Sequence, residues 1–346
     1  GAISGNVTIG RKLGMAALSR TEDQVKAALR AVIEADATIA EKAEMLMEIA
    51  MGLQQKPQSG ADLEAAVRLY ETALGLLHDR PALLAARIRA RLGTALMAIP
   101  GGGTEPVDRA RAAFESALTT LRAEGLPEET AEAEMNLGLA LQSLAGSGKA
   151  RIHDAISAYQ RALRTFDKGC HPKDFAILQN NLATAYLSVP FSDEKAKLRE
   201  ALAVQAFEEA LAVVNLVDHP SEYAMLQNNL GNALQYVGSS HRLQNGFRAL
   251  EAYDEALKVR TARATPAEYA NTIANKANCL LNLPDDPAAP EAGNAANCAA
   301  AGALLREAQQ IFDRLGEVEK AAMVAQAVMD LEGENPLAAR QANGAN

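Results

Sequence analysis

Two segments of this 346-residue chain match almost word for word, and looser copies of them recur along most of its length. The two are HPKDFAILQNNLATAYL from His171 and HPSEYAMLQNNLGNALQ from His219. Self-similarity with a period of about 45 residues is typical of stacked helical repeats. Each repeat in such an array packs mainly on its neighbours, so we expect function on an extended surface and not in a catalytic pocket.

Aligning the chain with itself predicts two alternating helix types. The first type, helix A, opens at a proline, which the first helical turn tolerates because its missing N–H has no partner to lose. Its body carries a large apolar residue, a small one directly after it, and a second large one three residues further on, all on one face. The copies are Leu92-Gly93-Leu96, Leu137-Gly138-Leu141, Leu182-Ala183-Tyr186 and Leu230-Gly231-Leu234, with Ile49-Ala50-Leu53 before them and Lys276-Ala277-Leu280 after them.

The second type, helix B, repeats an alanine, an aromatic residue four positions later, and a further alanine. A small residue lets two helix backbones approach closely, and the aromatic ring fills the groove beside it. The aromatic residue precedes the next proline by 13 residues in four successive repeats, which predicts a helix B lengthened uniformly by more than one turn. The aromatic positions are Tyr70, Phe114, Tyr159, Phe207 and Tyr253, with Leu305 in a degenerate sixth copy.

These patterns predict an all-α fold of about six helix pairs with a helix at each end. A single helix pair leaves one apolar face wet, and only stacking buries it. We expect one elongated domain, because the length of a solenoid measures the number of repeats and not the number of domains. The predicted divisions are a flexible segment 1–20, an N-terminal helix 21–37, the repeats 38–315, a capping helix 316–332 and a tail 333–346.

Composition narrows the possible partners. The net charge of −9 argues against a general nucleic-acid binder, which needs an excess of Lys and Arg on one face. No run approaches the length of a membrane span, and we expect no membrane insertion. The three cysteines form no CxxC pair, which favours a reducing compartment, and cytoplasmic is the default location, although a removed export signal would leave no trace.

The chain resembles the tetratricopeptide repeat superfamily, whose signature pairs Leu-Gly/Ala-x-x-Tyr in helix A with Ala-x3-Phe/Tyr-x2-Ala in helix B. The resemblance covers roughly residues 38 to 315 and implies a right-handed α-solenoid. Units of 44 to 52 residues with an NNLA core are similar to the long repeats of kinesin light chains. The family's frequent Trp, three residues before the signature Leu, is absent, and we expect the polar residues in its place to be solvated. They are Arg89, Glu134, Gln179 and Gln227.

An asparagine directly before the signature position is the most function-like feature. It recurs as Asn136, Asn181, Asn229 and Asn275, although Asn is a mediocre helix former. Its amide both donates and accepts, as pairing with a peptide backbone requires. The resemblance implies that these residues line a concave peptide groove, extended by one turn through Asn232 and Asn278. The alternative is a structural ladder in which the amides bridge neighbouring helices and hold no ligand.

Charged and histidine side chains give weaker signals. Arg87 and Arg91 lie one turn apart on helix A, where guanidinium groups can clamp a carboxylate. The alternative is that both arginines are solvated or paired with nearby glutamates. Lys276 is a possible second anchor. The paired His171 and His219 lack the short-spaced partners of a structural metal site, and we expect them to cap helices.

The sequence therefore predicts a non-catalytic scaffold or adaptor that binds an extended segment of another protein, with no cofactor and no metal. We found no nucleophile–base pair, P-loop, HExxH or dinucleotide fingerprint. An assembly or maturation chaperone for a particular enzyme complex, or the sensory module of a regulator that acts through another chain, would use the same surface. The identity of the partner and the oligomeric state are not encoded in these patterns.

Overall fold

A computed structural model describes residues 21–189, 194–237 and 241–334. Within these ranges the regular secondary structure is helical and includes no strand. No helix in the described part of the chain is both long enough and apolar enough to cross a membrane. The predicted flexible segment 1–20 and nearly all of the predicted tail 333–346 lie outside the described residues.

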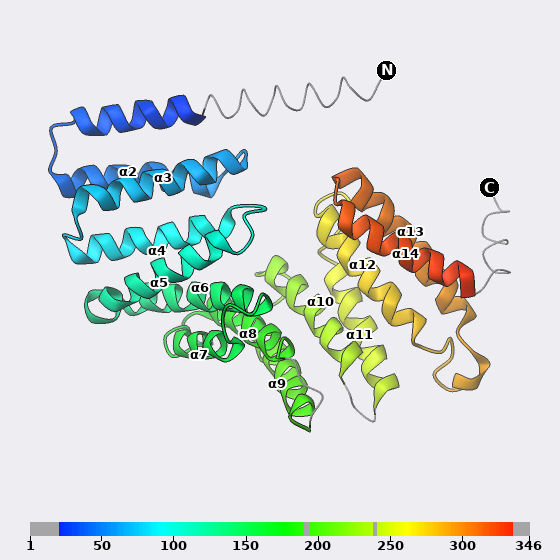
Figure 1. Cartoon of the computed structure of the whole chain (residues 1–346). Coiled ribbons are helices and arrows are strands. Elements are labelled where there is room, and N and C mark those ends of the chain that lie inside the picture. Colours follow the sequence, from blue (N-terminus) through cyan, green and yellow to red (C-terminus); the bar gives the residue numbers. More distant parts are fainter. Residues whose placement is uncertain (1–20, 190–193, 238–240, 335–346) are drawn as a thin grey trace, which may run out of the picture. The chain divides into compact units, whose positions relative to one another are not determined.

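The helices form two compact units, which we describe separately (Figure 1). Unit 1 contains residues up to Phe166 and unit 2 starts at Asp167. In unit 1, residues 21–34 are helical and are followed by three pairs: α2 (Ile39–Gln55) with α3 (Gly60–Leu77), α4 (Ala82–Ala98) with α5 (Glu105–Glu124), and α6 (Pro127–Gly146) with α7 (Ile152–Ala162).

Unit 2 repeats the same arrangement. Its pairs are α8 (Pro172–Leu187) with α9 (Glu194–Leu211), α10 (Pro220–Tyr236) with α11 (Arg242–Leu257), and α12 (Pro266–Leu281) with α13 (Ala295–Leu315), followed by α14 (Val318–Glu334); a short 3₁₀ turn, η1 (Pro290–Ala292), precedes α13. The predicted all-α fold of consecutive helix pairs is confirmed. The predicted division of the chain into domains stays a prediction.

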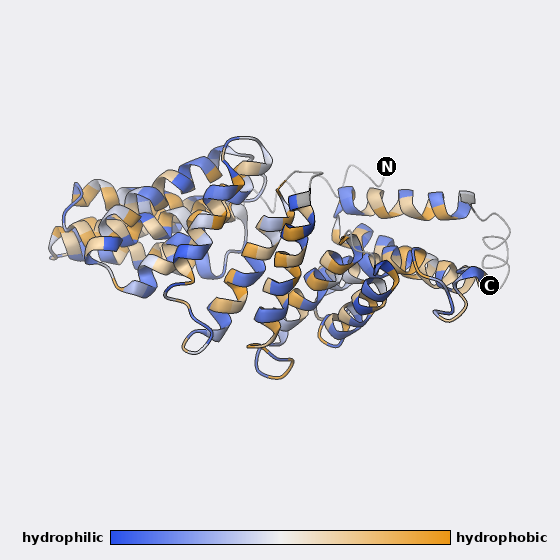
Figure 2. Ribbon diagram, turned by 90° about the horizontal axis from the view of Figure 1, so that it is seen from below, coloured by the Kyte–Doolittle hydropathy of each residue, from blue (hydrophilic) through white to orange (hydrophobic). Residues whose placement is uncertain are grey.

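The small residue of helix A is needed because the aromatic ring of helix B lies directly against it. A Cβ atom added to Gly138 would lie 2.4 Å from the ring of Tyr159, much closer than any ordinary contact. The ring itself is fully buried. Hydrophobic and hydrophilic residues alternate along the helices (Figure 2). The same contact recurs between Gly93 and Phe114, at 2.6 Å, and between Gly231 and Tyr253, at 2.7 Å.

The prediction of a uniformly lengthened helix B is wrong. Helix α5 does continue to Glu124, but α7, α9 and α11 end at or before the fourth residue after their aromatic residue. The residues that follow form a turn, in which a side chain accepts backbone N–H groups and so competes with the helix. Asp167 Oδ1 accepts from Gly169 N and Cys170 N, Asn215 Oδ1 accepts from Val217 N and Asp218 N, and Thr261 Oγ1 accepts from Ala264 N.

The expected capping role of the paired histidines is also wrong. His171 and His219 occupy the N-cap positions of α8 and α10, but neither side chain caps the helix. The side chains of Asp167 and Asn215, four residues earlier, close the turns instead. The HP step therefore marks a conserved turn geometry, with nearly equal backbone angles at the two histidines.

The polar residues three positions before the signature Leu are not all solvated, so the expectation that they are solvated is wrong. Glu134 is only 2% exposed, and Gln179 is also buried. A carboxylate can be buried when charged donors surround it. Glu134 accepts from Arg122 of α5 and Arg161 of α7, with the Arg161 Nη2 to Glu134 Oε2 distance at 2.8 Å. This ion triad joins three successive helices of unit 1.

In each unit the first helices of successive pairs also contact one another. We call α2, α4 and α6 the A layer of unit 1, and α8, α10 and α12 the A layer of unit 2. Each A layer has one side that carries the residue before the signature position. All the predicted binding residues lie on this side. The two layers differ sharply in chemistry on this side.

Candidate functional site

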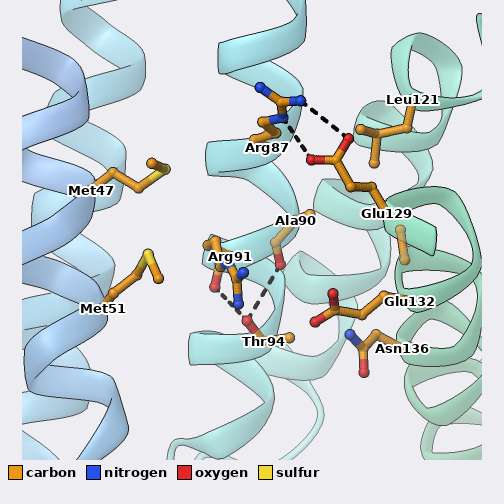
Figure 3. A pocket seen from close by; sticks show the side chains of 11 residues that line it. Met47, Met51, Arg87, Ala90, Arg91, Thr94, Leu121, Glu129, Glu132 and Asn136 are labelled. Atoms are coloured by element: carbon orange, nitrogen blue, oxygen red, sulfur yellow. Dashed lines mark hydrogen bonds and ion pairs between the residues drawn. The ribbon is translucent and has the colours of Figure 1, made fainter. Parts of the chain in front are cut away.

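The A layer of unit 1 contains a pocket of about 190 Å³, which we call the A-layer pocket (Figure 3). Its walls are side chains of α2, α4 and α6, with one residue from α5. Met47 and Met51 face it from α2, and Glu132 and Asn136 face it from α6. The remaining lining residues are Arg87, Ala90, Arg91 and Thr94 of α4, Leu121 of α5, and Glu129 and Ala133 of α6.

Only one of the two predicted arginines has a carboxylate partner. Arg87 donates through Nε to Glu129 Oε1 at 2.7 Å and through Nη2 to Oε2 at 3.3 Å, a bidentate pair. Burial raises the pKa of Glu129, but hydrogen bonds from Arg87 and from the Leu126 amide outweigh it and hold the pKa below its ordinary value. The Glu129 carboxylate therefore stays charged, and it is paired with the guanidinium of Arg87.

Arg91, one turn further along α4, is exposed. Among the described residues its guanidinium makes no hydrogen bond and no ion pair, and it acts on Glu129 and Tyr70 only through its charge. The predicted two-arginine clamp is thus half occupied in this structure. Arg91 is the cation that an incoming carboxylate can reach without displacing another.

Asn136 is half-buried and lines the pocket beside Glu132. Its side-chain amide makes no hydrogen bond within the part of the chain that the structure describes, which leaves donor and acceptor both open to a ligand. The two methionines supply polarizable apolar surface that adapts to many shapes. The pocket therefore combines an open cation, an open amide and a deformable apolar wall.

Three of the other predicted asparagines, Asn181, Asn229 and Asn275, lie in unit 2 and are linked by hydrogen bonds through Asn180 and Asn228. Their amides form a head-to-tail series across three helices, which we call the amide chain. Two of its bonds are between helices and two are between neighbours on one helix. The bonds run from Asn275 Nδ2 to Asn228 Oδ1 (3.2 Å), Asn228 Nδ2 to Asn229 Oδ1 (3.1 Å), Asn229 Nδ2 to Asn180 Oδ1 (2.7 Å) and Asn180 Nδ2 to Asn181 Oδ1 (3.2 Å).

The amide chain matches the structural alternative weighed in the sequence analysis. Apart from that of Asn275, each Oδ1 of the amide chain accepts one bond from another asparagine, so the amides hold one another in place. The last donor, Asn181 Nδ2, is buried and has no acceptor in the described structure. A buried amide without a partner costs free energy.

The predicted extensions of the strip differ from each other. Asn232 Oδ1 accepts from the hydroxyl of Tyr253, at 2.7 Å, and the residue also lines a second cavity of about 330 Å³ with Tyr186 and Leu187. Asn278 is half-buried, and its side chain makes no hydrogen bond with any described residue. Lys276, considered as a second anchor, pairs with Asp254 of α11.

Several participants were missed at the sequence level. Asn180 and Asn228 belong to the amide chain, although helix geometry places them about 100° from their neighbours. The doubled NN in both repeats was the available signal. Met47, Met51 and Glu132 also line the pocket. In register, Met47 takes the place of Asn180 and Asn228, and Met51 takes the place of Asn232 and Asn278, so the repeat pattern marks both positions but not the change to methionine.

Comparisons with known proteins give only distant likenesses. No family model and no curated protein sequence matches the chain. The structure of BtubC (BKLC) from P. vanneervenii is similar at 17% identity with a TM-score of 0.47, covering 81% of this chain and 93% of that one.

Two other solved structures are similar at the same level. The structure of MamA protein is 18% identical with a TM-score of 0.41 and covers 63% of this chain and 98% of that one. Rap protein complexed with competence and sporulation factor is 13% identical with a TM-score of 0.44, covering 92% and 81%. At identities and TM-scores this low, the likenesses say nothing about what this chain binds, and its fold class rests on the helix pairs themselves.

Proposed function

We propose that this chain is a non-catalytic scaffold that binds an extended segment of another protein along its A layers, with the A-layer pocket of unit 1 as the main contact. The observation that carries the proposal is the exposed guanidinium of Arg91, which lies in a pocket without a carboxylate partner from the described residues. Arg87, Arg122 and Arg161 all have carboxylate partners in the same unit.

The pocket suits a peptide better than a rigid small molecule. It is open between helices, and its volume is that of one or two side chains, so it can hold part of a longer segment. The free amide of Asn136 offers a donor and an acceptor, the pair of groups that a peptide backbone needs.

Selection of peptides by the purified protein tests the proposal. A displayed library of random linear peptides is panned on the protein, and binding of the selected peptides is measured by fluorescence anisotropy. Arg91→Ala should weaken binding about 10- to 100-fold, because a charge-assisted hydrogen bond contributes about 1.5–3 kcal/mol. Asn136→Ala should weaken it about fivefold.

The matched control is Arg68→Ala on α3, which removes an exposed arginine that is also without an ion pair in the described structure. It should leave binding unchanged. Unaltered helicity and melting of each variant show that the fold is intact. Failure to select any peptide, or selected peptides that bind Arg91→Ala as well as wild type, would rule the proposal out.

A further inference from the structure

The A-layer pocket contains a second charge without a partner, of opposite sign to Arg91. Glu132 lies on α6 and lines the pocket, it is exposed, and its carboxylate makes no hydrogen bond or ion pair with any described residue. Arg87 and Glu129 satisfy each other beside it. The open charges of the pocket are therefore one cation on α4 and one anion on α6.

We propose that Glu132 is a specificity-determining residue, and that the partner segment carries a basic side chain close to the acidic one that Arg91 holds. This inference rests on the proposed function and names the class of its ligand. A segment with an acidic and a basic residue close together would satisfy both open charges. A segment that is only acidic would place its second carboxylate near Glu132 and Glu129, where repulsion would weaken binding.

Electrostatics of this kind acts mainly on partner choice. Exposed ion pairs contribute about 0.2–1 kcal/mol each, so Glu132 adds only modest affinity for a matching ligand. Like charges placed together oppose binding, and complementary charges suppress wrong partners more than they strengthen right ones. The overall acidity of the chain adds to this effect, because a net charge of −9 repels strongly acidic segments before they reach Arg91.

The apolar wall of the pocket sets a third, looser requirement. Met47 and Met51 are both half-buried and extend their thioether side chains from α2 toward Arg91 and the pocket (Figure 3). Unbranched, polarizable side chains repack around different neighbours. We therefore expect an apolar residue next to the charged pair, with little preference among apolar types. We take the occupant to be an internal segment of a partner protein, whose side chains supply both charges and the apolar group, so that no chain terminus is needed.

The proposal is tested by reversing the charge of residue 132 and asking whether the charge of the selected peptides reverses as well. The random peptide library is panned in parallel on wild type and on Glu132→Lys. Peptides selected by wild type should carry Asp or Glu at a fixed spacing from Lys or Arg, and Glu132→Lys should bind them about tenfold more weakly, because an attraction becomes a repulsion. Peptides selected by Glu132→Lys should carry an acidic residue where wild type selects a basic one.

Two further variants complete the design. Glu64→Lys makes the same charge change on the exposed side of α3 and should bind the wild-type peptides normally. The double variant Arg91→Glu/Glu132→Arg should bind peptides whose acidic and basic residues have been exchanged. Selected peptides are synthesised both with a free C-terminus and as amides, and equal binding of the two forms supports an internal segment.

The outcomes separate this inference from the proposed function. Peptides that depend on Arg91 but carry no basic residue, or that bind Glu132→Lys as well as wild type, overturn the role of Glu132 and leave the proposed function standing. Binding that requires the free C-terminal carboxylate overturns the internal segment. A library that yields no binder, or binders indifferent to Arg91→Ala, removes the proposed function as well.

Discussion

The A layers of the two units place asparagine at the same repeat position and use it differently. In unit 1, Asn136 faces a pocket and makes no hydrogen bond with any described residue. In unit 2, Asn229 and Asn275 donate to asparagines of the preceding repeat, and the amides join three helices. Unit 1 also holds charges in its pocket, whereas the amide chain of unit 2 is uncharged.

This difference teaches that a recurring polar residue in a repeat protein does not have one role. In unit 2 each bond between helices runs from the asparagine before the signature position to the residue one place earlier on the preceding A-layer helix, and the doubled asparagines of α8 and α10 supply an amide there. In unit 1 the residue of α4 at that place is Ala90, which offers Asn136 no side-chain acceptor. The neighbouring repeat, and not the residue itself, decides whether the position is structural or available to a ligand.

The largest expected effect concerns whether the two units are independent. Gly138→Ala in unit 1 and Gly231→Ala in unit 2 each push a methyl group into a buried tyrosine ring, which should cost about 1–3 kcal/mol of unfolding free energy. Hydrogen exchange measured by mass spectrometry should show faster exchange only in the unit that carries the substitution.

Gly75→Ala on α3 is the control, because nothing lies within 4 Å of the added Cβ atom. It should be neutral or stabilising by up to about 1 kcal/mol, since Ala favours a helix over Gly. Equal acceleration of exchange in both units by either substitution would show that the chain unfolds as one body, and that the two units are not independent.

The second prediction concerns the asparagines themselves. Asn229→Ala leaves the Asn180 oxygen and the Asn228 nitrogen without their partners, and we expect a loss of about 1–3 kcal/mol in unfolding free energy. Asn136→Ala removes no bond to a described residue and should change stability by less than about 0.5 kcal/mol. Urea denaturation followed by circular dichroism measures both. Equal stability of the two variants would mean that the amide chain is not structural, and would extend peptide binding into unit 2.

The smallest effect is the pH dependence of the Arg87–Glu129 pair. The pKa of Glu129 lies below its ordinary value of 4.5 in the folded chain, so the pair stabilises the fold above that pH and its contribution disappears as the pH falls through the lowered pKa. The pair is partly exposed, with 42% and 29% of the two side chains accessible, and solvent weakens it.

Arg87→Met should therefore melt slightly below wild type at neutral pH and at the same temperature as wild type once the pH lies well below the lowered pKa of Glu129. Unit 2 has an ion pair of its own between neighbouring A-layer helices, Lys173 of α8 with Glu222 of α10 at 2.9 Å, and the Arg87→Met substitution leaves that pair in place. A gap in melting temperature that persists at acidic pH would show that Arg87 acts through packing and not through its charge.

Most of the fold was predictable from the sequence because close packing leaves a periodic trace. The small residue and the aromatic residue recur in step, and the structure shows them in contact. A second periodic pattern in the sequence was overlooked. Where helix B has tyrosine, helix A of the same pair has glutamine near its end, and where helix B has phenylalanine, helix A has an apolar residue there. The pairs are Tyr70 with Gln54, Tyr159 with Gln142 and Tyr253 with Gln235, against Phe114 with Met97 and Phe207 with Leu187.

The candidate site was less predictable, because the residue types at its positions change from repeat to repeat. Asn136 and Arg91 were identified from register, but the partner of each side chain depends on neighbouring helices that the register does not describe. Glu129 takes Arg87, and nothing in the spacing of the two residues distinguishes it from Glu132, which stays open. The buried Glu134 shows the same limit, because its burial depends on two arginines from other helices.

The contact between glycine and ring has a consequence for how such a protein can be rebuilt. Both halves of that contact, and both halves of each tyrosine–glutamine hydrogen bond, belong to one helix pair. Replacing α6 alone with the sequence of α8 would set Ala183 against the ring of Tyr159 and remove the glutamine that its hydroxyl needs. Grafts and chimaeras of this chain should therefore cut between pairs, since the two-helix cassette is the smallest part that carries its own fit.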